Sequence, residues 1–257
     1  MQSTATLQNA RLVDPEADRV FLGGLVIEDG RIAEVFEGPR IGLDCRGRHL
    51  APGIIDIGVK VGEPGERHKE SFRTAGAAAA AGGVTTIVVR PDTLPAIDTP
   101  ETLEFLQRRA IGGSPVHVLP MAALTKGRDG REMTEIGFLM DAGAVAFTDV
   151  RAVASARVFQ RCLTYATGLG ALVVGHPQEP ALSDGACITA GQFASQLGLP
   201  AVSPIAERIG LERDLALVEA TGARYHADQI SPAARASTIA MRSSSERSGG
   251  VSLKKVR

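Results

Sequence analysis

Three polar residues each end a short run of apolar and β-branched residues: Asp149, His176 and Asp228. Carboxylate and imidazole groups are zinc ligands, and both also act as general acids and bases. A polar residue at the end of a strand is equally often a hydrogen-bonded loop residue. For Asp149 and His176 the sequence therefore leaves two interpretations open, a weak metal site and a purely structural role.

The stretch D-I-G-V-K-V-G-E-P-G, from Asp56 to Gly65, follows the turn signal Pro52-Gly53 and is the second place where polar residues gather. Lys60 offers an ammonium group, which repels a cation while it is protonated, and a glycine offers a metal no side chain. Carboxylates left without a metal need another cation. We therefore predict that Lys60 forms a salt bridge with one of three carboxylates, those of Asp149, Asp92 or Glu63.

The elements that position these residues follow from the alternation of apolar runs. Six runs predict strands: Ile54–Val59, Val84–Arg90, Val116–Met121, Ala144–Asp149, Ala171–His176 and Ala223–Asp228. Five Ala- and Leu-rich stretches predict helices: Ser71–Ala81, Pro100–Arg109, Ala152–Gly168, Gly185–Leu197 and Leu211–Thr221. Such alternation indicates parallel βαβ units. In a (β/α)8 barrel the active site lies at the carboxyl ends of the strands, and six strands predict an incomplete barrel.

Two further segments flank this region. Residues 1–50 are predicted to form a separate β segment, in which Leu25–Phe36 is a hairpin that turns at Asp29-Gly30, because both turn positions tolerate positive φ. Residues 51–236 are predicted to form the barrel. Residues 237–257 are rich in Ser, Arg and Lys without an apolar period, and we expect a disordered tail.

Composition excludes several classes of protein. The 257 residues are 44% hydrophobic with a net charge of −1 and no basic stripe, which argues against a nucleic-acid partner. No apolar run approaches the ~20 residues that span a bilayer, and the first residues lack a secretory pattern. Cys45, Cys162 and Cys187 form no C-x-x-C pair and indicate reduced thiols in a cytoplasmic protein.

Several motifs in order carry a resemblance to a known family. They are N-A-R-L-V-D-P (Asn9–Pro15), E-D-G-R-I (Glu28–Ile32), A-P-G-I-I-D (Ala51–Asp56), E-P-G (Glu63–Gly65), H-K-E (His68–Glu70), A-A-A-A-G-G-V-T-T (Ala78–Thr86), P-D-T-L-P-A-I-D-T-P-E (Pro91–Glu101), A-V-A-F-T-D (Ala144–Asp149) and R-Y-H-A-D-Q-I-S (Arg224–Ser231). Over roughly residues 5–235 the chain resembles dihydroorotase, of the amidohydrolase superfamily. The resemblance implies an incomplete TIM-like barrel of the metallo-dependent hydrolase type, with a sandwich-like β segment before it.

In active members of this family two zinc ions polarise a bridging hydroxide, which opens or closes the ring amide of dihydroorotate. Their first barrel strand ends in H-x-H, and the matching positions here are Gly58 and Lys60. Asp149 matches the bridging carboxylate and His176 the first later histidine, while Gln229 stands where the second is expected. The strand with the catalytic aspartate lies beyond the end of this chain, so these positions resemble a vestigial metal site.

Two positions that hold the substrate carboxylate in the family are also altered. Gly62 stands where the arginine after H-x-H is expected, which removes a bidentate carboxylate anchor. Asp92 replaces the asparagine of P-N-T, so a carboxylate would face the substrate's own carboxylate. The expectation is that no catalytic residue is complete and that no cofactor binds, apart from weak metal binding by Asp149 and His176.

Three hypotheses about function follow. The first is a non-catalytic dihydroorotase-like protein of pyrimidine biosynthesis, a pseudoenzyme that serves as a scaffold for aspartate transcarbamoylase. The second is an active zinc-dependent dihydroorotase or other cyclic amidohydrolase with one metal. The third is a truncated or frameshifted fragment without function. An unclosed barrel also predicts unpaired sheet edges. In the family the N-terminal strands pack with a C-terminal segment, and without that segment we expect exposed apolar surface on the N-terminal strands and self-association into a homo-oligomer.

Overall fold

The computed structural model describes residues 4–231, and the predicted tail 237–257 lies outside them. The chain divides into two compact units, the first up to Ile54 and the second from Ile55 onward. The sequence places this boundary after residue 50.

The first unit is a single five-stranded sheet. Its strands are β1 (Thr4–Asp14), β2 (Arg19–Glu28), β3 (Arg31–Glu37), β4 (Leu43–Asp44) and β5 (His49–Leu50), in the order β3-β2-β1-β4, with β5 also paired to β1. The predicted hairpin is confirmed, because β2 and β3 pair antiparallel around Asp29 and Gly30, whose φ angles are 48° and 77°. Within residues 4–231 this unit contains one sheet, and the predicted sandwich-like arrangement stays a prediction.

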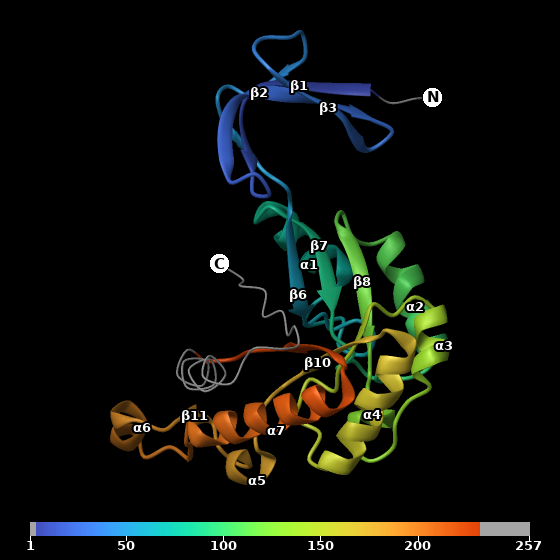
Figure 1. The fold of residues 1–257 in the computed structure, drawn as a ribbon, viewed down its shortest axis with the longest axis vertical. Helices are drawn as coiled ribbons and strands as arrows, with labels where there is room; N and C mark the ends of the chain where they lie inside the picture. The colour runs from blue at the N-terminus through green and yellow to red at the C-terminus, as the bar shows by residue number, and fades with distance from the viewer. Residues whose placement is uncertain (1–3, 232–257) are drawn as a thin grey trace. The chain divides into compact units, whose positions relative to one another are not determined.

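The second unit is built on a six-stranded sheet that follows chain order (Figure 1). Its strands are β6 (Ile54–Val59), β7 (Val84–Val89), β8 (His117–Ala122), β9 (Ala146–Phe147), β10 (Leu172–Gly175) and β13 (Arg224–Ala227). Neighbouring strands from β7 to β13 pair in parallel. Consecutive parallel strands joined by helices are the first part of a (β/α) barrel, which confirms the predicted fold class.

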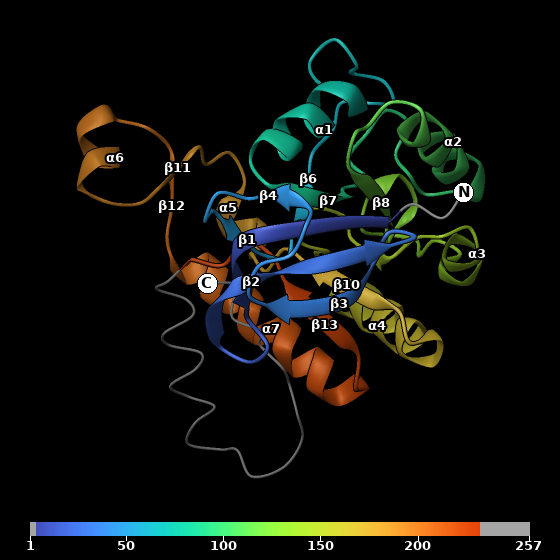
Figure 2. The ribbon, with the colours of Figure 1, turned by 90° about the horizontal axis from the view of Figure 1, so that it is seen from above.

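Helices cover one face of this sheet (Figure 2). The long ones are α1 (Phe72–Ala81), α2 (Pro100–Ile111), α4 (Ala156–Leu169) and α7 (Ile205–Thr221). Short ones are η1 (Lys126–Arg128), α3 (Ile136–Asp141), α5 (Pro180–Ser183) and α6 (Gln192–Leu197). Thr99 caps α2 and Pro100 occupies its first turn, as the sequence predicts. The main core lies between helices and strands, with Phe72, Leu106, Phe147 and Leu163 almost fully buried.

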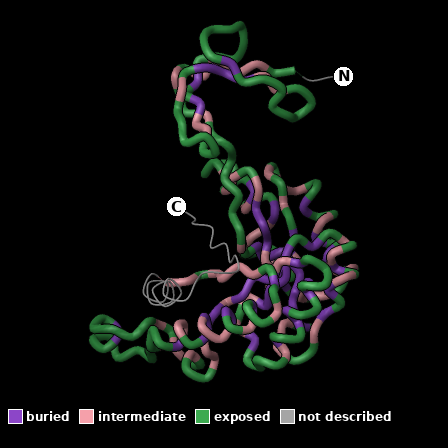
Figure 3. The backbone as a smooth tube through the Cα atoms, viewed as in Figure 1, coloured by how far each residue is buried: buried purple, intermediate pink, exposed green. Residues whose placement is uncertain are grey.

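A smaller apolar cluster belongs to the strands alone. It consists of Val88, Met121, Ala146 and Val174, with Leu172 packed against it. Val88 alternates with Ile87 and Val89, which join the helix-side core, so the cluster lies on the other face of the sheet. Figure 3 shows the buried residues of this unit gathered along its strands and inner helix faces.

Two of the predicted helices differ from the structure. The helix predicted over Gly185–Leu197 is wrong in its first half, because Ile188–Thr189 forms a short strand, β11, parallel to β12 (Ala201–Val202), and α6 begins only after Gly191. A β-branched pair between two glycines favours the extended conformation. Helix α7 begins at Ile205 rather than Leu211, and Gly210 inside it lets the backbone of Gln178 approach closely.

Strand β6 is the edge of the sheet in the described residues, with β7 as its hydrogen-bonded neighbour. Its isoleucines Ile54, Ile55 and Ile57 are 56%, 61% and 47% exposed. The sequence predicts exposed apolar strand surface for the first unit, and it is present there, with Val20, Leu22 and Ile32 exposed by 59%, 60% and 64%. No helix in residues 4–231 is both long enough and apolar enough to cross a membrane.

Candidate functional site

The polar residues singled out in the sequence gather at the carboxyl ends of the strands. Asp149 lies two residues beyond β9, and His176 and Asp228 directly follow β10 and β13. The backbone N–H of Asp228 donates to the carbonyl of Gly175, which fixes the end of β13 beside the end of β10. Because all these ends lie at one edge of the sheet, the region where a barrel enzyme places its chemistry is present.

Lys60, just beyond β6, forms the salt bridge that the sequence predicts. Its Nζ lies 3.3 Å from Asp92 Oδ2 and 3.9 Å from Glu66 Oε2. Of the three predicted partners the structure selects Asp92. The Asp92 carboxylate is thereby neutralised from within the chain.

Arg90 is the residue of this site that the sequence did not reveal. It directly follows β7, and its side chain is only 15% exposed. Its Nη2 donates to Asp92 Oδ2 at 3.0 Å and its Nε to Asp92 Oδ1 at 3.4 Å, a two-point contact between guanidinium and carboxylate. Two cations, Lys60 and Arg90, therefore share one oxygen of Asp92. The only available signal was a lone cation between an apolar strand and Pro91.

The two glycines of the altered motif differ in the space around them. Gly58 has a φ of 93°, and a Cβ built on it would lie 3.8 Å from Asp228 Oδ2 and 3.9 Å from Arg90 Cδ, so a side chain has room there. At Gly62 a Cβ would lie 2.4 Å from the carbonyl oxygen of Glu66. The loop backbone has closed over that position, and an arginine side chain does not fit without moving it.

Glu63, one residue later, is a buried structural anchor. Its residue is 6% exposed, and its Oε1 accepts from Arg109 Nη2 at 2.6 Å and Nε at 2.7 Å. Its Oε2 accepts the backbone N–H of Phe72, the first residue of α1, at 3.3 Å. The retained E-P-G motif thus ties the loop after β6 to both α1 and α2.

Asp149, the predicted bridging ligand, has its carboxylate fully used inside the fold. Oδ1 accepts the backbone N–H groups of Leu124 and Thr125 at 3.0 and 2.9 Å, and Oδ2 accepts the Thr125 hydroxyl at 2.5 Å. Burial raises the pKa of the Asp149 carboxyl above its usual value, although these hydrogen bonds act in the opposite direction. The next residue, Val150, has a φ of 62°, which is unusual for a β-branched side chain.

The remaining two predicted positions do not join Asp149. His176 Nε2 lies 3.2 Å from Gln178 Oε1, so the ring of this half-buried histidine donates to the amide oxygen when Nε2 carries the proton. Gln229 is exposed, with a φ of 56°, beyond the end of β13. The structure thus places His176 and Gln229 at the same edge of the sheet but in separate hydrogen-bonding environments.

A zinc centre does not fit these residues. Within residues 4–231 there is no group of three or more His, Cys, Asp or Glu side chains arranged to hold a metal ion. Gly58 lacks a ligand atom, Lys60 carries a positive charge next to Arg90, and the Asp149 oxygens already accept three hydrogen bonds. A catalytic zinc usually requires about three protein ligands, and the residues of this site within the described part of the chain do not supply them.

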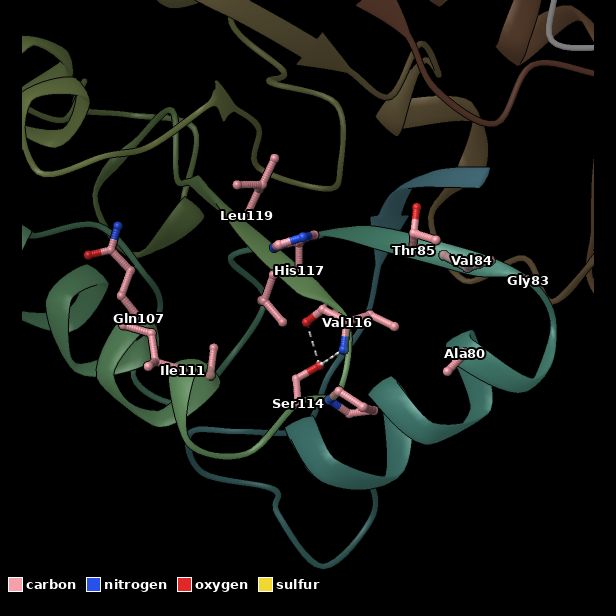
Figure 4. A pocket seen from close by; sticks show the side chains of 13 residues that line it. Ala80, Gly83, Val84, Thr85, Gln107, Ile111, Ser114, Val116, His117 and Leu119 are labelled. Carbon is pink, nitrogen blue, oxygen red and sulfur yellow. Dashed lines mark hydrogen bonds between the residues drawn. The ribbon is translucent and has the colours of Figure 1, made fainter. Parts of the chain in front are cut away.

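One cavity lies away from the candidate site. It has a volume of about 950 Å³ and is at the amino ends of β7 and β8, opposite to the polar strand ends, where Gln107, Ile111, Ser114 and His117 are among the side chains that line it (Figure 4). His117 is the one titratable side chain among the described residues around it, so no acid–base pair is formed there. A second cavity, of about 550 Å³, is lined by Val150, His176 and Gln178 and therefore borders the candidate site.

The chain is similar to a known protein family over most of its length. A model described as dihydro-orotase-like matches residues 47–234. The chain is 35% identical over 235 residues to the dihydroorotase of Syntrophus aciditrophicus, covering 88% of this chain and 55% of that protein. It is 36% identical over 236 residues to a dihydroorotase-like protein of Pseudomonas aeruginosa, covering 90% of this chain and 56% of the relative.

Solved structures agree on the fold. The L-hydantoinase (dihydropyrimidinase) of Arthrobacter aurescens superposes with a TM-score of 0.76 at 19% identity, over 93% of this chain and 56% of that one. A D-hydantoinase superposes with a TM-score of 0.74 at 20% identity, over 94% and 55%. The chain spans about half the length of the curated relatives and structures that it matches.

Proposed function

The chain belongs to the dihydroorotase-like family, and from this premise we propose that it is a non-catalytic member that serves pyrimidine biosynthesis by binding a partner rather than by turnover. One observation carries the proposal. Lys60 and Arg90 both neutralise Asp92 at the strand ends where catalysis by the family requires a metal. Without a metal no group among the described residues generates hydroxide near neutral pH.

The residues that hold substrate in the family support the same proposal. Gly62 offers no guanidinium, and its surroundings leave no space for one. Asp92 places a carboxylate where the family has an amide. The two cations beside it, Lys60 and Arg90, are already paired with Asp92 and are not free to bind a substrate carboxylate. A substrate with two carboxylates, such as carbamoyl aspartate, therefore finds no free cationic anchor in this loop.

The partner that we propose is aspartate transcarbamoylase, for which this chain would act as a scaffold. The support is indirect. The fold is retained around an altered site, and β6, with its exposed isoleucines, forms an edge of the sheet within residues 4–231 on which a second protein can pack. A relative named dihydroorotase-like protein rather than dihydroorotase, that of Pseudomonas aeruginosa, covers 90% of this chain.

Turnover is the first test. The purified chain, supplied with zinc and carbamoyl aspartate, is expected to form no dihydroorotate above the uncatalysed background, and metal analysis is expected to find less than one zinc per chain. The dihydroorotase of Bacillus caldolyticus, 39% identical over 211 residues, serves as the positive control under the same conditions. Cyclisation at a rate comparable to that control would establish the alternative, an active cyclic amidohydrolase.

Assembly is the second test. The tagged chain and aspartate transcarbamoylase from the same organism are expected to elute together from a size-exclusion column, at a mass larger than either alone. The matched control is Ile57→Lys, which places a charge on the exposed edge of β6 without removing a buried side chain. Separate elution of the two wild-type proteins at micromolar concentration would contradict the scaffold role while leaving the absence of turnover untouched.

A further inference from the structure

The backbone places Arg90, directly after β7, beside Gly58 in the neighbouring strand β6. The N–H of Arg90 donates to the carbonyl of Val59 at 2.9 Å, which holds the end of β7 against the end of β6. A Cβ built on Gly58 lies 3.9 Å from Arg90 Cδ, an ordinary van der Waals distance. The side chain of Arg90 therefore borders the space that a side chain at position 58 would enter.

Counter-charges surround this arginine. Asp92, whose side chain is 10% exposed, accepts two hydrogen bonds from the guanidinium. Asp228 lies on the far side of the same space, with Oδ2 at 3.8 Å from the Cβ position of Gly58. A poorly solvated cation needs such partners, because an unpaired charge away from water is strongly disfavoured. The carboxylates that border this space are thus next to a resident positive charge.

Arginine and lysine differ in how firmly they exclude a metal. A lysine ammonium in general can lose its proton and become a neutral amine, whereas an arginine guanidinium stays protonated in proteins. A divalent ion bound beside position 58 would lie next to this permanent charge and compete with it for Asp92. Repulsion between like charges at such short range is strong where water is scarce.

We propose that Arg90 occupies the role of the metal in this site, as a built-in cation that neutralises Asp92 and keeps divalent ions out. The inference deepens the proposed non-catalytic function and rests on it. Its consequence is specific. Restoring histidine at positions 58 and 60 does not restore zinc binding while Arg90 is present, and removing Arg90 in addition does.

Four forms of the full chain test the proposal: wild type, G58H/K60H, R90M and G58H/K60H/R90M. Histidine tolerates the positive φ of position 58 better than most residues. Zinc alone is the probe, and equilibrium dialysis with metal analysis gives the affinity. We expect the triple variant to bind zinc at least ten-fold more tightly than G58H/K60H, with Asp228 as a neighbouring carboxylate.

A matched control separates Arg90 from a general change in charge. Arg67→Met also removes one arginine from this region of the chain. The Arg67 side chain is 68% exposed and its ion pair with Glu63 is long, at 3.8 Å, while Glu63 keeps its closer partner Arg109. In the G58H/K60H background this control is expected to bind zinc within two-fold of its parent. If Arg90→Met does not fold, Arg90→Gln removes the charge and keeps a hydrogen-bond donor for Asp92.

The outcomes are distinct. The proposal is overturned if G58H/K60H binds zinc as tightly as the triple variant. It is also overturned if the triple variant binds no more zinc than the wild-type chain. Both results concern affinity for the metal. The proposed non-catalytic function fails on a different measurement, the formation of dihydroorotate by the wild-type chain, so the two failures are told apart.

Discussion

The end of β6 and the loop after it contain two sets of residues, one that keeps the family motif and one that departs from it, and their comparison shows what the fold requires. Glu63, Pro64 and Gly65 keep the family motif, and the structure gives Glu63 a buried role in joining α1 to α2. Gly58, Lys60 and Gly62 differ from the residues that the resemblance leads us to expect, and none of them joins two helices as Glu63 does. The retained residues of the motif are therefore ones that the fold itself requires.

Gly65 illustrates the retained set. Its φ is 94°, and a Cβ there would lie 2.3 Å from the carbonyl oxygen of Leu94. Gly58 has nearly the same φ, 93°, but its Cβ position meets only side-chain atoms at 3.8 Å or more. The two glycines share a backbone conformation and differ in close packing, so they form a matched pair.

The largest effect is expected from this pair. Gly65→Ala adds a severe steric contact to a left-handed backbone and should lower the free energy of unfolding by about 3–4 kcal/mol. Gly58→Ala carries only the backbone term, about 1–2 kcal/mol. Urea denaturation of both variants measures the difference. Equal losses would show that the retained glycine has no packing role beyond its φ.

Next in size is Glu63→Ala, which leaves Arg109 and the N–H of Phe72 without their acceptor. Because the arginine is 43% exposed and regains water, we expect a loss of about 2–3 kcal/mol, less than for a fully buried ion pair. Arg67→Ala, on the exposed side of the same carboxylate, should cost less than about 0.5 kcal/mol. If thermal unfolding placed both variants at the wild-type midpoint, the anchoring role of Glu63 would be wrong.

A smaller effect depends on pH. Burial raises the pKa of the Asp149 carboxyl, so the folded protein holds this proton more tightly than the unfolded chain does. The contribution of this group to stability is then greatest below the usual carboxyl pKa and falls as the pH rises through the raised value. Asp149→Asn removes that fall and should flatten the dependence of the urea midpoint between pH 4 and 7.

The matched comparison for this prediction is Asp184→Asn, because Asp184 is exposed and lies in the same unit. Its profile should follow that of the wild type. Asp214 keeps its own raised pKa, also through burial, in every one of these variants, so the profiles are compared with each other and not with a flat line. A steeper fall in the Asp149→Asn variant would reverse the predicted sign.

The smallest effect is expected at Lys60, in the altered set. Its side chain is 50% exposed, and its ion pair with Asp92 lies at the surface. Lys60→Ala should cost about 0.5 kcal/mol, because Arg90 still neutralises Asp92, and the cost should shrink further in 1 M salt. Calorimetry at two salt concentrations checks this. A loss as large as that of Glu63→Ala would remove the distinction between the two sets.

The sequence predicts what local patterns encode. The six strands and the Asp29-Gly30 turn follow from apolar alternation and turn chemistry, and the Lys60–Asp92 pair follows from the need to balance a leftover carboxylate. The helix over Gly185–Leu197 was wrong because alanine-rich composition outweighed two glycines and the β-branched pair Ile188–Thr189. Helical propensity is a weak guide where a short strand finds a partner.

The site itself depends on contacts between distant parts of the chain. Asp149 is bound by Leu124 and Thr125, which lie 25 and 24 positions away, and no spacing rule reveals those hydrogen bonds. Arg90 gives only a weak signal in the sequence, a lone cation before Pro91, because its role depends on Gly58, on the neighbouring strand. The lack of space at Gly62 likewise depends on the position of the Glu66 carbonyl oxygen, which the sequence alone does not give.

The position of β6 at the edge of the described sheet has a practical consequence for handling the protein. Three isoleucines in a row of four residues, interrupted only by Asp56, form a segment of high β-propensity with a single charge to discourage stacking of chains. During overexpression or storage at high concentration this segment is where fibrillar aggregation is expected to nucleate. Replacing Ile55 or Ile57 by lysine is expected to reduce this aggregation.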